Sequence, residues 1–104
     1  MSIFQNVSVG KAANVYFDGN VSSRTLEFAD GSKKTLGVML PGEYTFNTAE
    51  AENMDFCRGE FEVKLPGSDA FVAMSAPCDF DVPANSAFTI RVKSISDYCC
   101  SFIK

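Results

Sequence analysis

A stretch of alternating apolar and polar residues between Gly37 and Gly67 constrains this chain more than any other feature of its sequence. In two segments, every second side chain is suited to a buried face: Tyr44, Phe46 and Thr48 in the first, and Phe61, Val63 and Leu65 in the second. Successive side chains of a β-strand point to opposite faces of a sheet, so this period of two predicts two half-buried strands. Pro41-Gly42 and Pro66-Gly67 predict turns beside them. The centre of the chain is therefore expected to be β-sheet.

The rest of the chain repeats these signals at short intervals. Asp18-Gly19 and Asp30-Gly31 each end a run rich in β-branched and aromatic residues, which predicts hairpin turns. Residues 88–92 alternate with Phe88, Ile90 and Val92 inward, and residues 98–103 form a final strand. One helical turn is expected over residues 48–54, with Thr48 as its cap. Roughly nine or ten short strands with almost no helix favour an all-β barrel or jelly roll.

The size and charge of the chain limit what it can do. Its 104 residues make a single domain, 1–104, in which residues 1–12 are an N-terminal extension or edge strand. No apolar run approaches the roughly 18 residues that span a membrane, and the N-terminus lacks the features of a signal peptide. We therefore expect a cytoplasmic protein with no membrane partner. A net charge of -4 makes nucleic acid an unsuitable partner.

The cysteines and the missing histidine bear on metal binding. The four cysteines show no Cys-x-x-Cys spacing, and the chain contains no histidine. Zinc sites need such ligands in clusters, so we expect reduced thiols and no metal. The remaining carboxylate and carbonyl oxygens suit only hard cations such as Mg²⁺ or Ca²⁺.

The spacing of Glu52 and Gly59, with six residues between them, followed by residues 82–88, resembles the two-part motif of the cupin superfamily. Cupins are small β-barrels, and many bind a metal through histidines. At those positions this chain carries Phe46, Thr48 and Phe88. The resemblance implies a single-domain cupin-like β-barrel or jelly roll without the usual metal, with Glu52 at its open end.

Longer sequence words resemble the pyrimidine/purine nucleoside phosphorylase family of small cupin-like proteins over nearly the whole chain, from about Asn14 to Cys100. These words are Gly37-Val38-Met39, Pro41-Gly42-Glu43-Tyr44-x-Phe46-x-Thr48, Leu65-Pro66-Gly67 and Val82-Pro83-Ala84-Asn85-Ser86-x-Phe88. The resemblance implies cleavage of purine and pyrimidine nucleosides by phosphate to free base and (deoxy)ribose 1-phosphate. Phosphate is then a co-substrate and no cofactor is required. The chain departs from the family at Arg58, expected beside the pocket, and at Pro77, expected only to change a turn.

Phosphorolysis at C1′ develops positive charge on the ribose and needs no protein nucleophile. Aromatic rings bind any base by stacking, worth about 1 to 3 kcal/mol per base. Tyr44, Phe46 and Phe88 are the candidates for such a wall, with Thr48 completing the substrate-binding set. The alternative is that these rings only fill the interior.

Glu52 is the candidate catalytic residue, through hydrogen bonds to the ribose hydroxyls or stabilisation of charge at C1′; the alternative is a solvated carboxylate in a turn. The candidate phosphate-binding residues, chosen by their side-chain chemistry, are Arg24 and Arg91. Arg24 lies two positions before Leu26 and so shares its face of the strand. Arg91 alternates away from Phe88, so it reaches phosphate only if the barrel is open there or a neighbouring chain completes the site.

Three functions stay open at this point. The first is a nucleoside phosphorylase, and the second is a non-enzymatic cupin-like module that binds a small sugar or nucleotide. The third is a structural protein whose interior is filled. Exposed strand edges favour a homodimer in which edge strands pair across a two-fold axis.

Overall fold

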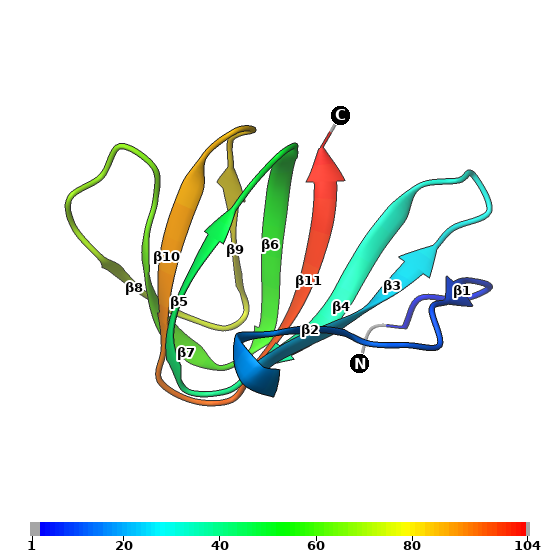
Figure 1. The fold of residues 1–104 in the computed structure, drawn as a ribbon, viewed down its shortest axis with the longest axis horizontal. Helices are drawn as coiled ribbons and strands as arrows, with labels where there is room; N and C mark the ends of the chain where they lie inside the picture. The colour runs from blue at the N-terminus through cyan, green and yellow to red at the C-terminus, as the bar shows by residue number, and fades with distance from the viewer. Residues whose placement is uncertain (1–2, 104) are drawn as a thin grey trace.

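The computed structural model describes residues 3–103, and most of them belong to two antiparallel sheets packed face to face (Figure 1). The larger, seven-stranded sheet contains, in spatial order, β1 (Ser8–Val9), β3 (Val21–Glu27), β4 (Lys33–Met39), β11 (Ser96–Ile103), β6 (Ala51–Arg58) and β9 (Cys78–Val82), with β2 (Asn14–Tyr16) also paired to β3. The smaller sheet contains β5 (Gly42–Asn47), β10 (Ala87–Val92), β7 (Glu60–Lys64) and β8 (Val72–Ser75). A short 3-10 turn, η1 (Phe17–Gly19), joins β2 to β3. The prediction of an all-β, cupin-like jelly roll is confirmed, although the sheets do not close into a barrel.

The period-two pattern of the sequence marks the buried faces of the smaller sheet. In β7, Phe61 and Val63 are each 1% exposed, and in β10 Ile90 is fully buried. Phe61 packs against Phe56 of the larger sheet with ring centroids 4.3 Å apart. These side chains form the contact between the two sheets, and removing their apolar surface from water stabilises the fold.

The helical turn expected over residues 48–54 is wrong. Residues 51–58 form β6, because Met54 and Phe56 alternate into the core and strand pairing with β11 and β9 buries them. Thr48 caps no helix. Its Oγ1 donates to the carbonyl of Pro83 (2.7 Å) and accepts from the N–H of Ser86 (3.0 Å). This residue therefore ties the β5–β6 connection to the β9–β10 connection.

The N-terminal segment supplies a strand at one border of the larger sheet. Ser8 pairs with Glu27 and Val9 with Leu26, so β1 adds to β3 as an edge strand. Phe4 packs edge-on against Phe28 with ring centroids 5.3 Å apart. Among residues 3–103, no helix has the length and apolar character needed to cross a membrane.

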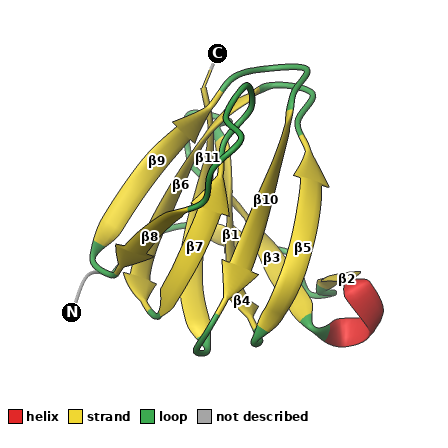
Figure 2. Ribbon diagram, turned by 90° about the vertical axis from the view of Figure 1, so that its left-hand side faces the viewer, coloured by secondary structure: helices red, strands yellow, loops and turns green. Residues whose placement is uncertain are grey.

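The two sheets differ in width, and this difference creates room inside the molecule. Figure 1 shows β3 and β4 extending beyond the smaller sheet, whose strand β5 forms the border nearest to them. Figure 2 shows β5 and β10 in front of β3 and β4. The inner face of the larger sheet is therefore only partly covered.

Candidate functional site

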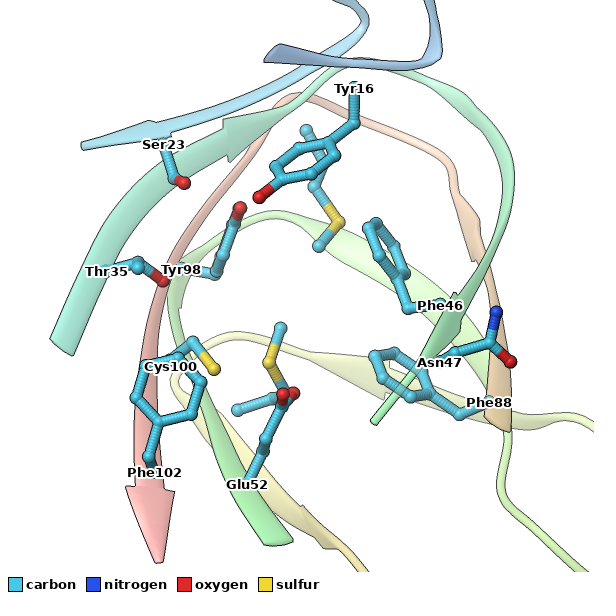
Figure 3. A pocket seen from close by; sticks show the side chains of 12 residues that line it. Tyr16, Ser23, Thr35, Phe46, Asn47, Glu52, Phe88, Tyr98, Cys100 and Phe102 are labelled. Carbon is cyan, nitrogen blue, oxygen red and sulfur yellow. The ribbon is translucent and has the colours of Figure 1, made fainter. Parts of the chain in front are cut away.

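A cavity of about 220 Å³ lies between the inner face of the larger sheet and strands β5 and β10 (Figure 3). Most of its lining comes from the larger sheet, and Phe46, Asn47 and Phe88 come from the smaller one. The lining residues are Tyr16, Ser23, Thr35, Met39, Phe46, Asn47, Glu52, Met54, Phe88, Tyr98, Cys100 and Phe102. An interior with an open cavity argues against a purely structural protein with a filled core.

One wall of the cavity is aromatic. Phe46 of β5 and Phe88 of β10 are register partners, and their rings stack at 5.5 Å between centroids with an interplanar angle of 25°. Phe17 braces Phe46 edge-on at 5.4 Å. A flat ligand can stack on this wall whatever hydrogen-bonding groups its edge carries.

Glu52 brings a carboxyl group into the cavity from the start of β6 (Figure 3). Burial raises the pKa of this carboxyl above its ordinary value, and the nearby charge of Glu50 raises it further. A hydrogen bond with the Cys100 thiol acts in the opposite direction. Glu50 itself is exposed, so the two acidic residues occupy different environments although they are two positions apart.

Four hydroxyl groups line the side of the cavity formed by β2, β3, β4 and β11. They belong to Tyr16, Ser23, Thr35 and Tyr98. None of the four is among the site residues predicted from the sequence, because serine and threonine occur in many strands and the family resemblance at Tyr16 and Tyr98 implied no role for them. The alternation of inward and outward residues in β4 and β11 could have identified two of them. Thr35 lies on the same face of β4 as the buried Met39, and Tyr98 lies on the same face of β11 as the buried Cys100.

The structure places Glu52, Phe46 and Phe88, three of the residues predicted for the site, in the lining of one cavity. It leaves Tyr44 and Thr48 outside the cavity. The Tyr44 hydroxyl donates to the carbonyl of Leu40 (2.7 Å), and its ring, 4% exposed, packs on Phe17. Tyr44 holds the turn before β5, so the aromatic wall consists of Phe46 and Phe88.

Neither arginine proposed for phosphate reaches the cavity. Ser23 and Thr25 face inward on β3, which sends Arg24 to the exposed outer face. The Nε of Arg91 donates to Glu43 Oε1 (2.7 Å), and its guanidinium lies 3.7 Å from the ring centroid of Phe71. Both side chains belong to the outer surfaces of the sheets.

The departures from the family pattern also lie away from the cavity. Arg58 ends β6, at the opposite end of the strand from Glu52, and its Nε lies 3.3 Å from Asp97 Oδ2. The expectation that Arg58 sits beside the pocket is therefore wrong. Pro77 lies in the connection between β8 and β9, as expected for a change confined to a turn.

The four cysteines are unpaired thiols, of which Cys57 is exposed and Cys100 is buried in the cavity wall. Burial raises the pKa of Cys100 to about 12, so this thiol stays protonated. Within residues 3–103, no three His, Cys, Asp or Glu side chains gather in a group that suits a metal ion.

Comparison with known proteins gives consistent matches over the whole chain. A family described as pyrimidine/purine nucleoside phosphorylase matches residues 11–102. A protein of that name from Hydrogenovibrio crunogenus is 60% identical over 103 residues, 99% of each chain. Another from Sulfurimonas denitrificans is 55% identical over 104 residues, 100% of each chain.

Solved structures agree on the fold. A protein of unknown function from Acinetobacter sp. ADP1 superposes with a TM-score of 0.94 at 42% identity, covering 97% of this chain and 98% of that one. An RmlC-like cupin from Shewanella frigidimarina superposes with a TM-score of 0.69 at 16% identity, covering 97% and 86%. The second match supports the cupin fold alone.

Proposed function

The chain belongs to the pyrimidine/purine nucleoside phosphorylase family, and on that basis we propose that it cleaves both purine and pyrimidine nucleosides with inorganic phosphate. The products are free base and (deoxy)ribose 1-phosphate, which makes the enzyme a pentosyltransferase within the glycosyltransferases. The observation that carries this proposal is the cavity in which the Phe46–Phe88 stack and the Glu52 carboxyl face one space.

The aromatic wall accounts for a broad choice of base. Phe46 and Phe88 offer ring faces and no hydrogen-bonding groups, so a purine and a pyrimidine stack on them alike. Stacking is worth about 1 to 3 kcal/mol per base. A wall of this kind selects for flatness, and we expect it to accept several bases with similar affinity.

Glu52 acts on the sugar. During phosphorolysis a phosphate oxygen forms a bond to C1′ while the C1′–N bond breaks, and the base leaves with the bonding electrons and takes up a proton. The ribose ring carries positive charge at the midpoint of this exchange. A carboxylate that accepts hydrogen bonds from the ribose hydroxyls, or lies close to C1′, stabilises that charge in a partly buried site. No metal and no cofactor take part.

The exposed edges of the sheets support a homodimer. Strands β5 and β8 border the smaller sheet, and β9 borders the larger one. Unpaired edge strands offer N–H and C=O groups to a second chain, and a two-fold axis satisfies both copies at once. Light scattering at micromolar concentration is expected to give the mass of two chains; a monomer would remove this expectation. The cytoplasmic location likewise stays a prediction.

The activity is tested by incubating the purified protein with uridine or adenosine, with and without phosphate. We expect free base only when phosphate is present, together with one equivalent of ribose 1-phosphate. Base release without phosphate would indicate a hydrolase. Binding of nucleosides with no base released from any of them would support the alternative, a non-enzymatic cupin-like module for a small sugar or nucleotide.

A further inference from the structure

The cavity presents a problem for a phosphate co-substrate, because none of the residues 3–103 that line it is a lysine or an arginine. Glu52 carries the one carboxyl group among the described lining residues, and the negative charge of its carboxylate repels phosphate. The other polar groups are uncharged: the hydroxyls of Tyr16, Ser23, Thr35 and Tyr98, the Asn47 amide and the Cys100 thiol. Among the described residues, the groups that this cavity offers to a phosphate are therefore neutral donors, which proteins also use to hold phosphate oxygens.

Strand register brings a row of polar groups together at one side of the cavity. Asn14 of β2 lies opposite Ser23 of β3, Ser23 opposite Gly37 of β4, and Gly37 opposite Tyr98 of β11. A Cβ on Gly37 would lie 2.6 Å from Tyr98 Cζ. The missing side chain of Gly37 thus lets the Tyr98 ring lie across β4, where the Ser23 side chain acts to lower the pKa of the Tyr98 hydroxyl.

The hydrogen bonds of this row run in one direction. The Asn14 amide nitrogen donates to Ser23 Oγ (3.3 Å) and to Thr25 Oγ1 (3.2 Å). Ser23 Oγ accepts from Asn14, so its own proton is free to be donated to the Tyr98 oxygen. The Tyr98 proton is then left to point into the cavity. When Ser23 donates to Tyr98 in this way, the Tyr98 hydroxyl is a donor toward the space where substrate binds.

Tyr98 keeps that proton over the whole working range of pH. The residue is 7% exposed, and burial raises the pKa of its hydroxyl to about 12. Figure 3 shows the Tyr16 hydroxyl pointing toward the Tyr98 hydroxyl from the opposite side. Two phenol groups from different strands thus converge on one point, well apart from Glu52 at the other end of the cavity (Figure 3).

We propose that the Tyr16 and Tyr98 hydroxyls bind the oxygens of the phosphate co-substrate, and that Asn14 and Ser23 are positioning residues that direct the Tyr98 proton toward it. This inference rests on the proposed phosphorylase function. It divides the cavity into three parts: phenol hydroxyls for phosphate, Glu52 for ribose, and Phe46 with Phe88 for the base.

The inference is tested by steady-state kinetics with phosphate and nucleoside varied separately. Tyr98→Phe removes one oxygen and keeps the ring, and we expect the KM for phosphate to rise about ten-fold or more while the KM for uridine changes less than about two-fold. Asn14→Asp replaces the amide that donates to Ser23 by a carboxylate that only accepts hydrogen bonds. Ser23 then donates its proton to Asp, and the Tyr98 hydroxyl donates to Ser23 and no longer to phosphate. The same selective rise is expected for this variant. Thr45→Val is the control, because that hydroxyl bonds Thr89 (2.9 Å) on the exposed outer face.

A rise in the KM for uridine with the KM for phosphate unchanged would overturn the inference. If Tyr98→Phe does not fold, Ser23→Ala tests the same donor row with a smaller change, and a phosphate KM equal to that of Thr45→Val would be equally damaging.

The inference and the proposed function are tested separately by isothermal titration calorimetry, in which inorganic phosphate alone is added to the protein. Wild-type protein that binds phosphate, with the binding weakened about ten-fold or more in Tyr98→Phe, supports the phosphate site even if no base is released from any nucleoside. Wild-type protein that releases base while Tyr98→Phe binds phosphate equally well would refute the site and leave the phosphorylase function standing.

Discussion

Glu52→Gln tests whether the carboxyl in the cavity acts on the sugar. The amide keeps the volume and most hydrogen-bonding capacity of the side chain, but it carries no charge to oppose the positive charge of the transition state. A hydrogen bond to a charged group contributes about 1.5 to 3 kcal/mol. Loss of that contribution in a site that excludes much of the solvent corresponds to about a ten- to hundred-fold lower turnover. The assay is base release from one nucleoside at saturating phosphate.

Glu50→Gln is the matched control, because it makes the same chemical change at an exposed position on the approach to β6. We expect its turnover to change less than about two-fold and its free energy of unfolding to change by less than about 0.5 kcal/mol. Equal turnover of the two variants would refute the reasoning and leave Glu52 a partly buried carboxyl without a catalytic role.

The pH dependence of the two variants adds an independent check. Burial raises the pKa of Glu52, so the active carboxylate is lost as the pH falls through that raised value. Glu50 contributes to this rise, and Glu50→Gln should move the acid limb of the turnover profile to lower pH.

The folded state binds the Glu52 proton more tightly than the unfolded state, so folding stability decreases as the pH rises from the ordinary pKa to the raised one. At neutral pH Glu52→Gln should therefore raise the melting temperature while it lowers turnover; a lower melting temperature would contradict this account.

Three further predictions follow from the same structure. Phe46→Leu removes half of the stacked aromatic wall and should raise the KM for uridine and for adenosine alike, by about five- to a hundred-fold if stacking of about 1 to 3 kcal/mol is lost; a loss for one base only would indicate recognition of the base edge. Gly37→Ala forces a Cβ against the carbonyl of Ser22 and to 2.6 Å from Tyr98 Cζ, and urea unfolding should show a stability lower by about 1 to 3 kcal/mol, whereas unchanged stability would mean that β4 and Tyr98 move apart at little cost. Activity should survive an excess of EDTA, and its complete loss followed by recovery with one added metal would contradict a metal-free mechanism.

The sequence predicted the sheets well because two local signals agreed along most of the chain. Alternation identified the inward faces of β7 and β10, and Asp-Gly or Pro-Gly pairs marked several of the turns. The prediction failed at residues 48–54, where good helix formers such as Ala51 and Glu52 occupy a strand. Pairing of β6 with strands on both sides outweighs their weak preference for helix.

The site was only partly predictable for a related reason. Phe46 and Phe88 stand in sequence words that resemble the family, Glu52 stands in the cupin spacing, and all three line the cavity. Ser23 and Tyr98 are far apart in the sequence and meet only through the register of β3, β4 and β11. Arg24 was chosen by the chemistry of its side chain, but its parity on β3 places it on the opposite face. Cross-strand geometry, which local patterns do not encode, decides such cases.

The unequal width of the two sheets separates the residues that hold the molecule together from those that face the cavity. Phe56, Phe61 and Ile90, each at most 1% exposed, lie outside the cavity lining. Ser23 and Thr35 line it from strands that extend past the smaller sheet (Figure 1). Changes at these two positions leave no void among the tightly packed rings. The cavity wall on this overhang can thus be changed separately from the packed rings, although Ser23, 5% exposed and hydrogen-bonded to Asn14, still contributes to a folding stability that amounts to only about 5 to 15 kcal/mol in typical domains.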